Sequence, residues 1–575
     1  NTLYAEKTID EDSRAVTVVS DQLGRKILER RGADNDTYFV YDDLGQLRLV
    51  MPPEVADYYE NNSSQSFSAQ SNVMLQYGYE YRYDSRHNCI YKRLPGCDPI
   101  YYVYDKADRC ILSQDGEQRN SGKWSFHIPD VYGRTVVTGI CSNSIVYTNE
   151  PLKNVVVTAY RSSASGNILG YQVTYFSPSQ PSAYSANYYD DYSFISSAVP
   201  TTLTYTSPPT GGFGTQGLTT PKGLLTGTAA GRINASGISG YNYSAIYYDD
   251  KSRVIQTRSS NHMGGFDYEY TGYNYMDNVL KRQHVHSASG MSTQTETYTY
   301  EYNANTGLLE TTKHKLNTNS EVTLHQYTYN DIGQLTGKTN GGISSAAETY
   351  TYNVRSWLKT ITAGTLFNET LYYNDTYGGS TPQYGGNLSA MTWKADSKTR
   401  GYKFTYDALS RLTNAQYMEN GSSSTHYDTE YTYDKMGNIL TLKRHGKITD
   451  TAYPPIDNLT FTYTGNQVTR IDDSGYTPSY TGAFNFVNGA TQSNEYTYDK
   501  NGNMTKDLNK KISSIGYNFL NLPSNITYST GPSATYIYDA TGQKLRTSYK
   551  ASASATAVPT DYCGNMIYEN GVLKQ

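Results

Sequence analysis

The most constraining feature of this sequence is a short motif that recurs along most of it, Tyr-x-Tyr-Asp/Asn-x-x-Gly-x-Leu/Ile/Met. Copies return at intervals of roughly 20 to 30 residues, and a period of this kind is typical of stacked supersecondary units. Each interval is long enough for two short strands and a turn. The chain is therefore predicted to consist of consecutive hairpins. Clear copies begin at Tyr41, Tyr329, Tyr433, Tyr498 and Tyr538.

Each position of the motif has a physical role. Alternating tyrosines place their rings on one face of a strand, because side chains alternate with period two. The following Asp or Asn hydrogen-bonds its own backbone and starts a turn. The Gly supplies a positive φ, so Gly437 and Gly502 are predicted to lie in left-handed turn positions. The closing apolar residue begins the return strand. This pattern predicts antiparallel hairpins and excludes parallel βαβ crossovers.

The motif degenerates in places and fades in one region. Asp108, Ser356 and Ser410 stand where other copies have Gly. We find no sustained apolar period with caps that would predict helices. Between residues 149 and 240 the chain is rich in Ser, Thr, Gly and Pro, which is typical of an irregular insertion in the wall of a repeat structure or a small cap. A separate β-sandwich there is the alternative. The predicted segments are an N-terminal repeat segment at 1–148, the insertion or cap at 149–240, and an incomplete C-terminal repeat segment at 241–575.

Tyr dominates the aromatic residues, with 61 Tyr against 13 Phe and 3 Trp. Tyr favours strands and buries a large ring while its hydroxyl still reaches water or a partner. Large sheets with wet faces are expected from such a composition. Because a long sheet twists, it must close or spiral, which also hides its edges. The predicted fold class is all-β, with antiparallel hairpin repeats coiled into a spiral, hollow shell.

Charge and hydropathy exclude several classes of function. The net charge is −5 with both signs interspersed, so no basic stripe exists for nucleic acid. No apolar run approaches the length needed to span a membrane. The five cysteines include no Cys-x-x-Cys pair. Unpaired thiols are the favoured interpretation, and one disulfide among Cys89, Cys97, Cys110 and Cys141 is the alternative.

These Tyr-Asp-x-x-Gly-x-Leu units resemble the Rhs/YD-repeat family, which includes bacterial polymorphic toxins, toxin-complex cocoon proteins, wall-associated proteins and teneurins. The resemblance covers most of residues 1–150 and 241–575. It implies a hollow spiral β-shell, which in the toxin branch encloses a C-terminal effector and in the wall-associated and teneurin branches serves adhesion. Toxin members end their repeats with an Asp-Pro-x-Gly core. Here Asp98-Pro99 is followed by Ile100 and Tyr101, so no autoprotease is assigned to this chain.

The expected function is that of a non-catalytic shell scaffold that encapsulates or carries a C-terminal effector not present in this chain. The alternative is a cell-surface module that binds a protein or a glycan. An enzyme is the third hypothesis. The resemblance also implies an extracellular or cell-surface location and a secretion-system or outer-membrane partner. No catalytic, cofactor-binding or metal-binding residue is assigned, and no cofactor is expected.

Two motifs with candidate chemistry are better explained by structure. Residues 333–339 resemble a phosphate-binding loop but have three residues between the glycines where that loop needs four, and no helix signal follows. His284 and His286 are predicted to share one strand face, as metal-binding pairs do. No third ligand lies nearby in the sequence, and the adjacent Lys281 and Arg282 oppose a cation. Exposed strand histidines are therefore expected.

The remaining candidates are single residues or short acidic runs. His262 is read as a lone histidine in a turn. The acidic residues at 10–12, 34–36 and 249–250 offer oxygen ligands for calcium, but none fits an EF-hand loop, and solvated turns are expected. Paired carboxylates are recognised only by geometry, so a glycosidase-like site stays open at this stage. Exposed tyrosines and three tryptophans are candidates for stacking on sugars or partner proteins, although the sheet itself explains most of the tyrosines. These tryptophans are Trp124, Trp357 and Trp393.

Overall fold

The computed structural model describes residues 3–478, 482 and 484–575. Strands account for 49% of the chain and helices for 5%, so the all-β prediction is confirmed. Among the described residues, 41 strands are assigned to one long antiparallel sheet, and β12 and β13 form a separate hairpin. Within that same part of the chain, no helix is both long and apolar enough to cross a membrane.

The chain divides into two compact units, each assembled from stretches that are far apart in the sequence. Unit 1 contains residues 1–99 and 328–510, and unit 2 contains residues 100–327 and 511–575. The units describe packing, whereas the three segments at 1–148, 149–240 and 241–575 describe the repeat pattern along the chain. Those segment boundaries stay a prediction.

The strands of unit 1 are β1 (Tyr4–Ile9), β2 (Ala15–Ser20), β3 (Lys26–Arg31), β4 (Asn35–Tyr41), β5 (Leu47–Met51), β6 (Tyr79–Tyr83), β7 (Cys89–Arg93), β23 (Leu335–Asn340), β24 (Glu348–Tyr352), β25 (Leu358–Ala363), β26 (Phe367–Tyr372), β27 (Ala390–Lys394), β28 (Thr399–Tyr406), β29 (Leu412–Glu419), β30 (Ser422–Ser423), β31 (Thr429–Tyr433), β32 (Ile439–His445), β33 (Pro455–Thr464), β34 (Gln467–Asp473), β35 (Tyr496–Tyr498) and β36 (Met504–Asp507).

The strands of unit 2 are β8 (Ile100–Tyr104), β9 (Cys110–Gln114), β10 (Lys123–Pro129), β11 (Thr135–Ser142), β12 (Thr158–Arg161), β13 (Tyr171–Thr174), β14 (Ser179–Tyr189), β15 (Leu225–Asn234), β16 (Gly237–Tyr248), β17 (Val254–Ser260), β18 (Phe266–Tyr273), β19 (Val279–Ser287), β20 (Gln294–Tyr302), β21 (Leu309–Leu316), β37 (Ile512–Tyr517), β38 (Pro523–Tyr528), β39 (Ser533–Asp539), β40 (Lys544–Lys550), β41 (Val558–Cys563), β42 (Met566–Glu569) and β43 (Val572–Leu573). Strand β22 (Val322–Tyr329) contains the point in the sequence where the chain passes from unit 2 to unit 1.

Within the described residues, three short helices interrupt the strands, although the sequence pattern predicted none. They are α1 (Pro53–Asn61), α2 (Asn72–Tyr77) and α3 (Gly116–Asn120). Their starts carry ordinary helix signals: Pro53 occupies the first helical position of α1, and the Ser71 side chain accepts a hydrogen bond from the Met74 N–H at the start of α2. Helix α3 has a complete capping box between Asp115 and Gln118. Single-turn 3₁₀ helices also occur at Tyr147–Asn149, Thr201–Leu203 and Ser344–Ala346.

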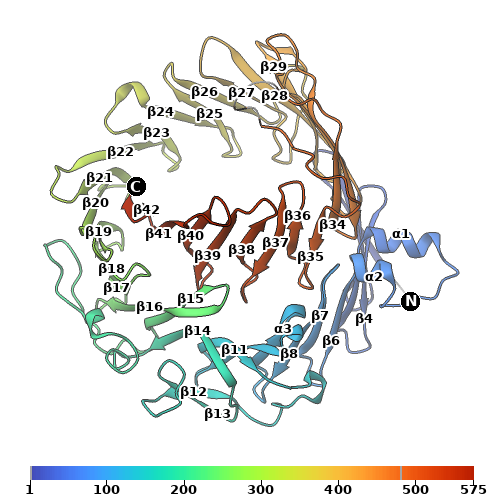
Figure 1. Ribbon diagram of the computed structural model, residues 1–575. Helices are drawn as coiled ribbons and strands as arrows, with labels where there is room; N and C mark the ends of the chain where they lie inside the picture. The colour runs from blue at the N-terminus through green and yellow to red at the C-terminus, as the bar shows by residue number, and fades with distance from the viewer. Residues whose placement is uncertain (1–2, 479–481, 483) are drawn as a thin grey trace. The chain divides into compact units, whose positions relative to one another are not determined.

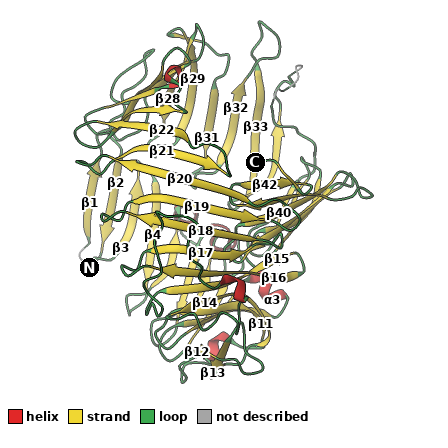
Figure 2. Ribbon diagram, turned by 90° about the vertical axis from the view of Figure 1, so that its left-hand side faces the viewer, coloured by secondary structure: helices red, strands yellow, loops and turns green. Residues whose placement is uncertain are grey.

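Neighbouring strands in the sheet are mostly neighbours in the sequence. The run from β14 to β21 pairs antiparallel in chain order, and Figure 2 shows β17 to β20 side by side. One pairing in unit 2 joins distant stretches, since Arg232 and Ile233 of β15 pair with Asp539 and Tyr538 of β39. Figure 1 shows β39 beside β15. The C-terminal strands are thereby held against strands that lie about half a chain earlier.

The motif turn has the geometry that its residues predict. The Asp42 N–H donates to the Gln46 carbonyl at 3.0 Å, and the Gly45 N–H donates to the Asp42 carbonyl at 2.9 Å. The Asp42 carboxylate accepts a hydrogen bond of 2.9 Å from the Gln46 N–H. Gly437 and Gly502 have φ values of 94° and 86°, so the prediction of left-handed turn glycines is confirmed.

Degenerate copies keep the same turn without Gly. Asp108, Ser356 and Ser410 have φ values of 57°, 63° and 63°. Left-handed backbone costs a non-glycine residue roughly 1–2 kcal/mol, so these turns carry strain that the rest of the repeat offsets. The carboxylate or amide that opens the turn is present in each, because Asp105, Asn353 and Asp407 accept backbone N–H bonds.

A tyrosine hydrogen bond joins many of the repeats to the one before it, which the sequence pattern did not predict. The Tyr83 hydroxyl donates to the carbonyl of Leu47, the closing residue of the preceding motif, at 3.0 Å. The Tyr352 hydroxyl donates to Leu335 in the same way at 2.9 Å. The motif tyrosine therefore provides both a ring for the sheet face and a donor for the backbone of the preceding repeat. Equivalent bonds run from Tyr248 to Leu225, Tyr273 to Val254, Tyr302 to Val279, Tyr406 to Leu388, Tyr433 to Leu412, Tyr463 to Ile439 and Tyr498 to Val468.

Several strands of unit 1 are partly accessible along their whole length. Every residue of β2, β23, β25, β26 and β34 is half-buried, where a strand between core and solvent would alternate buried with exposed. The chain exposes 28926 Å² in total, against about 20,000 Å² for one compact protein of this mass and about 24,500 Å² for two of half the mass. Much of the sheet is therefore a single layer with two wet faces.

Unit 2 contains the main apolar core. It gathers residues from β8 to β17 and from the insertion region, including Leu152, Phe176, Phe194 and Leu203. Trp124 lies in this core with 1% of its surface exposed. The irregular region thus covers part of the sheet with apolar side chains, which single-layer parts of unit 1 lack.

Candidate functional site

A polar cleft of about 710 Å³ lies within unit 2. Its walls come from the turn before β18, from β18 to β20, and from the segment after β39 through β41. Ionisable side chains dominate the lining, among them His262, Asp267, Glu269, His284, Glu296 and Cys563. Such a gathering of titratable groups in a concavity makes this cleft the candidate functional site.

Strand register explains why these side chains share one face. Asp267 of β18 lies opposite His286 of β19, and Glu269 lies opposite His284. His284 also lies opposite Glu296 of β20. Directly opposed residues of antiparallel strands point to the same face, and residues two apart on one strand do so too. An acidic row and an imidazole row are therefore placed side by side.

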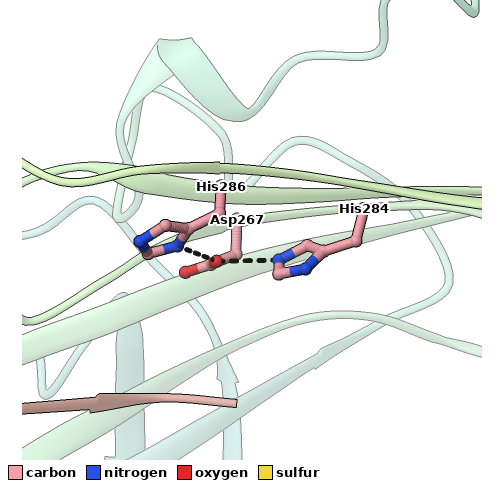
Figure 3. Close-up of side chains that lie close together, drawn as sticks. All are labelled: Asp267, His284 and His286. Carbon is pink, nitrogen blue, oxygen red and sulfur yellow. Dashed lines mark hydrogen bonds and ion pairs between the residues drawn. The ribbon is translucent and has the colours of Figure 1, made fainter. Parts of the chain in front are cut away.

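Two imidazoles converge on one carboxylate oxygen at the centre of this face, as Figure 3 shows. The Oδ1 atom of Asp267 lies 2.9 Å from Nε2 of His284 and 2.6 Å from Nδ1 of His286. Burial alone would raise the pKa of Asp267, but the hydrogen bonds from both histidines outweigh it and hold that pKa well below its ordinary value. Burial lowers the pKa of His284, yet the Asp267 carboxylate raises it further, so the net direction is upward.

Each member of this trio has a second polar partner. Asn261 donates to the other oxygen of Asp267 at 2.9 Å. The Nε2 atom of His286 lies 2.9 Å from the hydroxyl of Tyr568 in β42, and both side chains are buried. The Nδ1 atom of His284 lies 3.8 Å from Glu296 Oε2. The trio is thus fixed in orientation from three sides.

A second cluster includes His262 and Cys563, which also line the cleft. The Nε2 atom of His262 lies 2.9 Å from Asp561 Oδ1, and Arg546 donates to the same carboxylate at 2.6 Å. The Sγ atom of Cys563 lies 3.9 Å from His262 Nδ1. This order of thiol, imidazole and carboxylate resembles a nucleophilic triad, but burial, with Asp267 and Asp561 nearby, raises the pKa of Cys563 to about 12. The thiol is therefore neutral and unsuited to attack.

The structure corrects two expectations about the histidines. His286 is completely buried, and the side chain of His284 is 14% exposed, so the prediction of exposed strand histidines is wrong. A third ligand-type group does lie close by. Asp267, His284 and His286 each offer an atom, and these atoms lie within 4.8 Å of one another. The charge of Arg282 was expected to oppose a cation at this site, but Arg282 is paired with Glu269 at 2.7 Å. His262 is not a lone turn histidine either, since Asp561 holds it.

The other candidate residues have structural partners. Gly333 lies in a motif turn and Gly337 within β23, so residues 333–339 form no phosphate loop. Asp36 pairs with Arg30 at 2.5 Å, and Asp249 pairs with Arg253 at 2.7 Å. Solvated turns were expected here, and that prediction is wrong for both carboxylates.

Asp12 and the tryptophans also have defined surroundings. The Asp12 carboxylate accepts the backbone N–H groups of Tyr384 and Gly385 at 2.6 and 2.9 Å. Trp124 is buried in the core, so it is not available for stacking on a ligand. The rings of Trp357 and Trp393 lie 4.9 Å from Tyr373 and 5.7 Å from Tyr402, respectively. All five cysteines are free, so the prediction of unpaired thiols is confirmed.

Comparison with known proteins gives a likeness in fold alone. No family model matches the sequence, and no curated protein matches it. A crystal structure of TcdB2-TccC3 with Cdc42 matches 97% of this chain with a TM-score of 0.62 at 13% identity. A crystal structure of TcdB2-TccC3 without its hypervariable C-terminal region matches 98% with the same score and identity.

This chain folds like those structures. The Tc holotoxin pore of Photorhabdus luminescens also matches over 98% of the chain, with a TM-score of 0.62 and 13% identity. The chain spans about a quarter of the length of the TcdB2-TccC3 chains that it matches. The likeness supports the Rhs-like shell fold that the motif predicted. Function does not follow from it directly, because one fold can serve several functions.

Proposed function

We propose that this chain is the non-catalytic β-shell scaffold of an Rhs/YD-repeat protein and that it carries a C-terminal effector lying outside these 575 residues. The observation that supports this most is the single-layer sheet of unit 1, whose strands β25 and β26 are partly accessible on both faces. A sheet with two wet faces suits a wall between two aqueous spaces. It does not suit the core of a solid domain.

The chemistry of that sheet fits a container. Strands such as Glu348–Tyr352 and Thr429–Tyr433 carry Thr and Tyr in alternation and no long aliphatic side chain. A surface of hydroxyls and rings is hydrated and only weakly adhesive, because its polar groups are already hydrogen-bonded. Such a lining would hold a passenger without trapping it irreversibly.

The fold likeness supports a proposal about partners. Solved structures with this fold include Tc toxin complexes, and one of them is described as lacking a hypervariable C-terminal region. By analogy, the passenger of this chain would be a C-terminal effector, a secretion-system or outer-membrane component would be the partner, and the site of action would be extracellular.

Protection of a passenger tests the proposal. A small protease-sensitive reporter is fused after Gln575, and the same reporter is fused before Asn1 in a matched control. We expect the C-terminal reporter to resist protease while the N-terminal one is digested. Small-angle scattering of the chain alone is expected to give one body whose radius of gyration exceeds the value of about 25 Å for a compact solid of this length by several Å.

Two results would overturn the proposal. Equal digestion of the two reporters would remove the carrier function. A pair-distance distribution typical of a solid body, or of beads on a string, would remove the container itself. In either case the surface module that binds a protein or glycan would become the leading alternative, and a glycan array on the same purified chain would test it.

A further inference from the structure

We infer that Asp267, His284 and His286 form a binding site for a divalent first-row transition metal, Zn²⁺ in the first place, in the cleft of unit 2. This site goes beyond the scaffold function and does not depend on it. The three donor atoms lie within 4.8 Å of one another and come from two adjacent strands.

The donor set fits such a metal. Two imidazole nitrogens and one carboxylate oxygen suit Zn²⁺, which is bound at about 2.0–2.2 Å by these groups. In a tetrahedral site, donors at that radius lie about 3.3 Å apart. The Asp267 oxygen lies 2.9 and 2.6 Å from the two nitrogens, so these two distances need to open by about 0.4 and 0.7 Å. Ca²⁺ and Mg²⁺ prefer oxygen ligands alone and fit poorly.

The outer contacts are those that a metal site requires. A ligating histidine usually donates its other ring N–H to an acceptor, which sets its tautomer and orientation. Here the other nitrogen of His286 meets the Tyr568 hydroxyl at 2.9 Å, and that of His284 faces the Glu296 carboxylate at 3.8 Å. Asn261 holds the second oxygen of Asp267. All three ligands therefore have an orienting partner.

Proton balance is satisfied by the same contacts. Without metal, the His284 Nε2–H and His286 Nδ1–H groups point at Asp267. Metal binding requires each of these nitrogens to be free of its proton. In a neutral imidazole the proton then lies on the other nitrogen, which in His286 meets the Tyr568 hydroxyl at 2.9 Å and in His284 faces the Glu296 carboxylate at 3.8 Å. No oxidant, reductant or leaving group is involved.

Charge and access also favour a cation. Asp267 has no Lys or Arg partner among the described residues, since Arg282 is paired with Glu269 and Arg546 with Asp561. Asp267, His284 and Glu296 line the cleft, so the fourth coordination position would face solvent or a ligand held there. Three protein ligands with one open position is the arrangement of catalytic zinc sites, whereas structural sites use four protein ligands.

Metal titration of the purified chain tests the inference. After chelator treatment and dialysis, we expect one Zn²⁺ to bind per chain in competition with a chromophoric chelator, and Co²⁺ to give ligand-field bands. Asp267→Asn and His284→Gln are each expected to weaken Zn²⁺ binding at least about tenfold. His325→Gln, which changes a histidine of β22 outside the trio, should leave binding unchanged. Circular dichroism checks that each variant is folded.

A measurement on the unmodified chain guards against variants that fail to fold. X-ray absorption at the zinc edge should give a first shell of nitrogen and oxygen that includes two imidazoles. Tyr568→Phe keeps all three ligands and should lower affinity by less than either ligand substitution, with Co²⁺ bands of unchanged shape. The inference would be overturned if the unmodified chain bound no Zn²⁺, or if Asp267→Asn and His284→Gln bound Zn²⁺ as tightly as the unmodified chain. A first shell that contains the sulfur of Cys563 would overturn it too.

Discussion

The hydroxyl of Tyr433 donates a hydrogen bond of 2.7 Å to the carbonyl oxygen of Leu412. Tyr433 opens one motif turn and Leu412 closes the turn of the preceding motif. Arg411, beside Leu412, lies over the Tyr433 ring at 4.7 Å and donates to the Asp434 carbonyl at 2.7 Å. Consecutive repeats are thus joined by side-chain contacts at their turns as well as by the strand ladder.

Tyr433→Phe should cost about 1 kcal/mol of local stability, because it removes one hydrogen bond and leaves the Leu412 carbonyl without this donor. Native-state hydrogen exchange should show faster exchange in β28, β29 and β31 and little change elsewhere, since repeat structures couple mainly to nearest neighbours. Tyr431→Phe on the same strand is the matched control, as its hydroxyl makes no hydrogen bond to the described residues. Equal effects of the two substitutions would show that the bond contributes nothing.

At turn positions with positive φ, removing a glycine should destabilise the protein and introducing one should stabilise it. Gly437→Ala is expected to cost about 1–2 kcal/mol of stability through left-handed backbone strain. A Cβ there meets no atom within 4 Å, so steric crowding adds nothing to this cost. Ser410→Gly should instead stabilise by roughly 0.5–1 kcal/mol, because it relieves strain in a degenerate copy. Gly211→Ala, equally uncrowded and outside the left-handed region, is the control. Denaturant midpoints measure all three, and a Ser410→Gly variant less stable than the parent would contradict the account.

Stability in acid should depend on Asp12. Burial would raise the pKa of this carboxyl, but the N–H groups of Tyr384 and Gly385, together with Arg14, outweigh burial and hold the pKa below its ordinary value. A depressed pKa stabilises the fold above the unfolded-state value of about 3.9, and that stability is lost as the pH falls through the folded-state pKa. Asp12→Asn should therefore destabilise the protein at pH 7 and much less near pH 2. The exposed Asp43→Asn change serves as the control, and a difference independent of pH would contradict the assignment.

The thiols should fall into two reactivity classes. Cys141 and Cys563 are buried, and burial raises the pKa of Cys141 to about 11 and, with nearby carboxylates, that of Cys563 to about 12. Thiol reagents react with the thiolate, so these two should react only after unfolding. Cys89 and Cys97 are half-buried and should react slowly in the folded protein. Mass spectrometry after alkylation measures this, and rapid labelling of Cys563 in the native state would restore the triad interpretation.

The sequence determined the turns because their chemistry is local. Asp42, Gly45 and the closing Leu47 act within seven residues, so residue type alone predicts the turn and the strands beside it. The link from Tyr83 to Leu47 depends instead on how one repeat is registered against the next, which no local pattern contains. Helix α3 was predictable, since Asp115 and Gln118 have the spacing of a capping box, but five residues are too short to give an apolar period.

The candidate site also depends on register between strands, so no local sequence pattern could predict it. His284 and His286 were recognisable as a pair, yet their third partner lies on the neighbouring strand. Asp267 meets His286 only because the β18–β19 hairpin sets this register. Tyr568 comes from the C-terminal strands, which the pairing of β15 with β39 helps to hold in unit 2. A search along β19 alone could not find either residue. Once hairpin pairs were assigned, the alternating acids of Phe266–Tyr273 would have been the signal.

Because both units are discontinuous, the order of synthesis matters for folding. Unit 1 needs residues up to 510 and unit 2 needs residues up to 575, although each begins within the first 100 residues. On the ribosome, some early stretches of each unit, such as β15 and the turn at Asp12, must wait for partners made several hundred residues later. Their unpaired edges are then exposed to other chains for the time that translation takes, at about 5–20 residues per second. Efficient production should therefore depend on chaperones or slow expression more than on the stability of the finished protein.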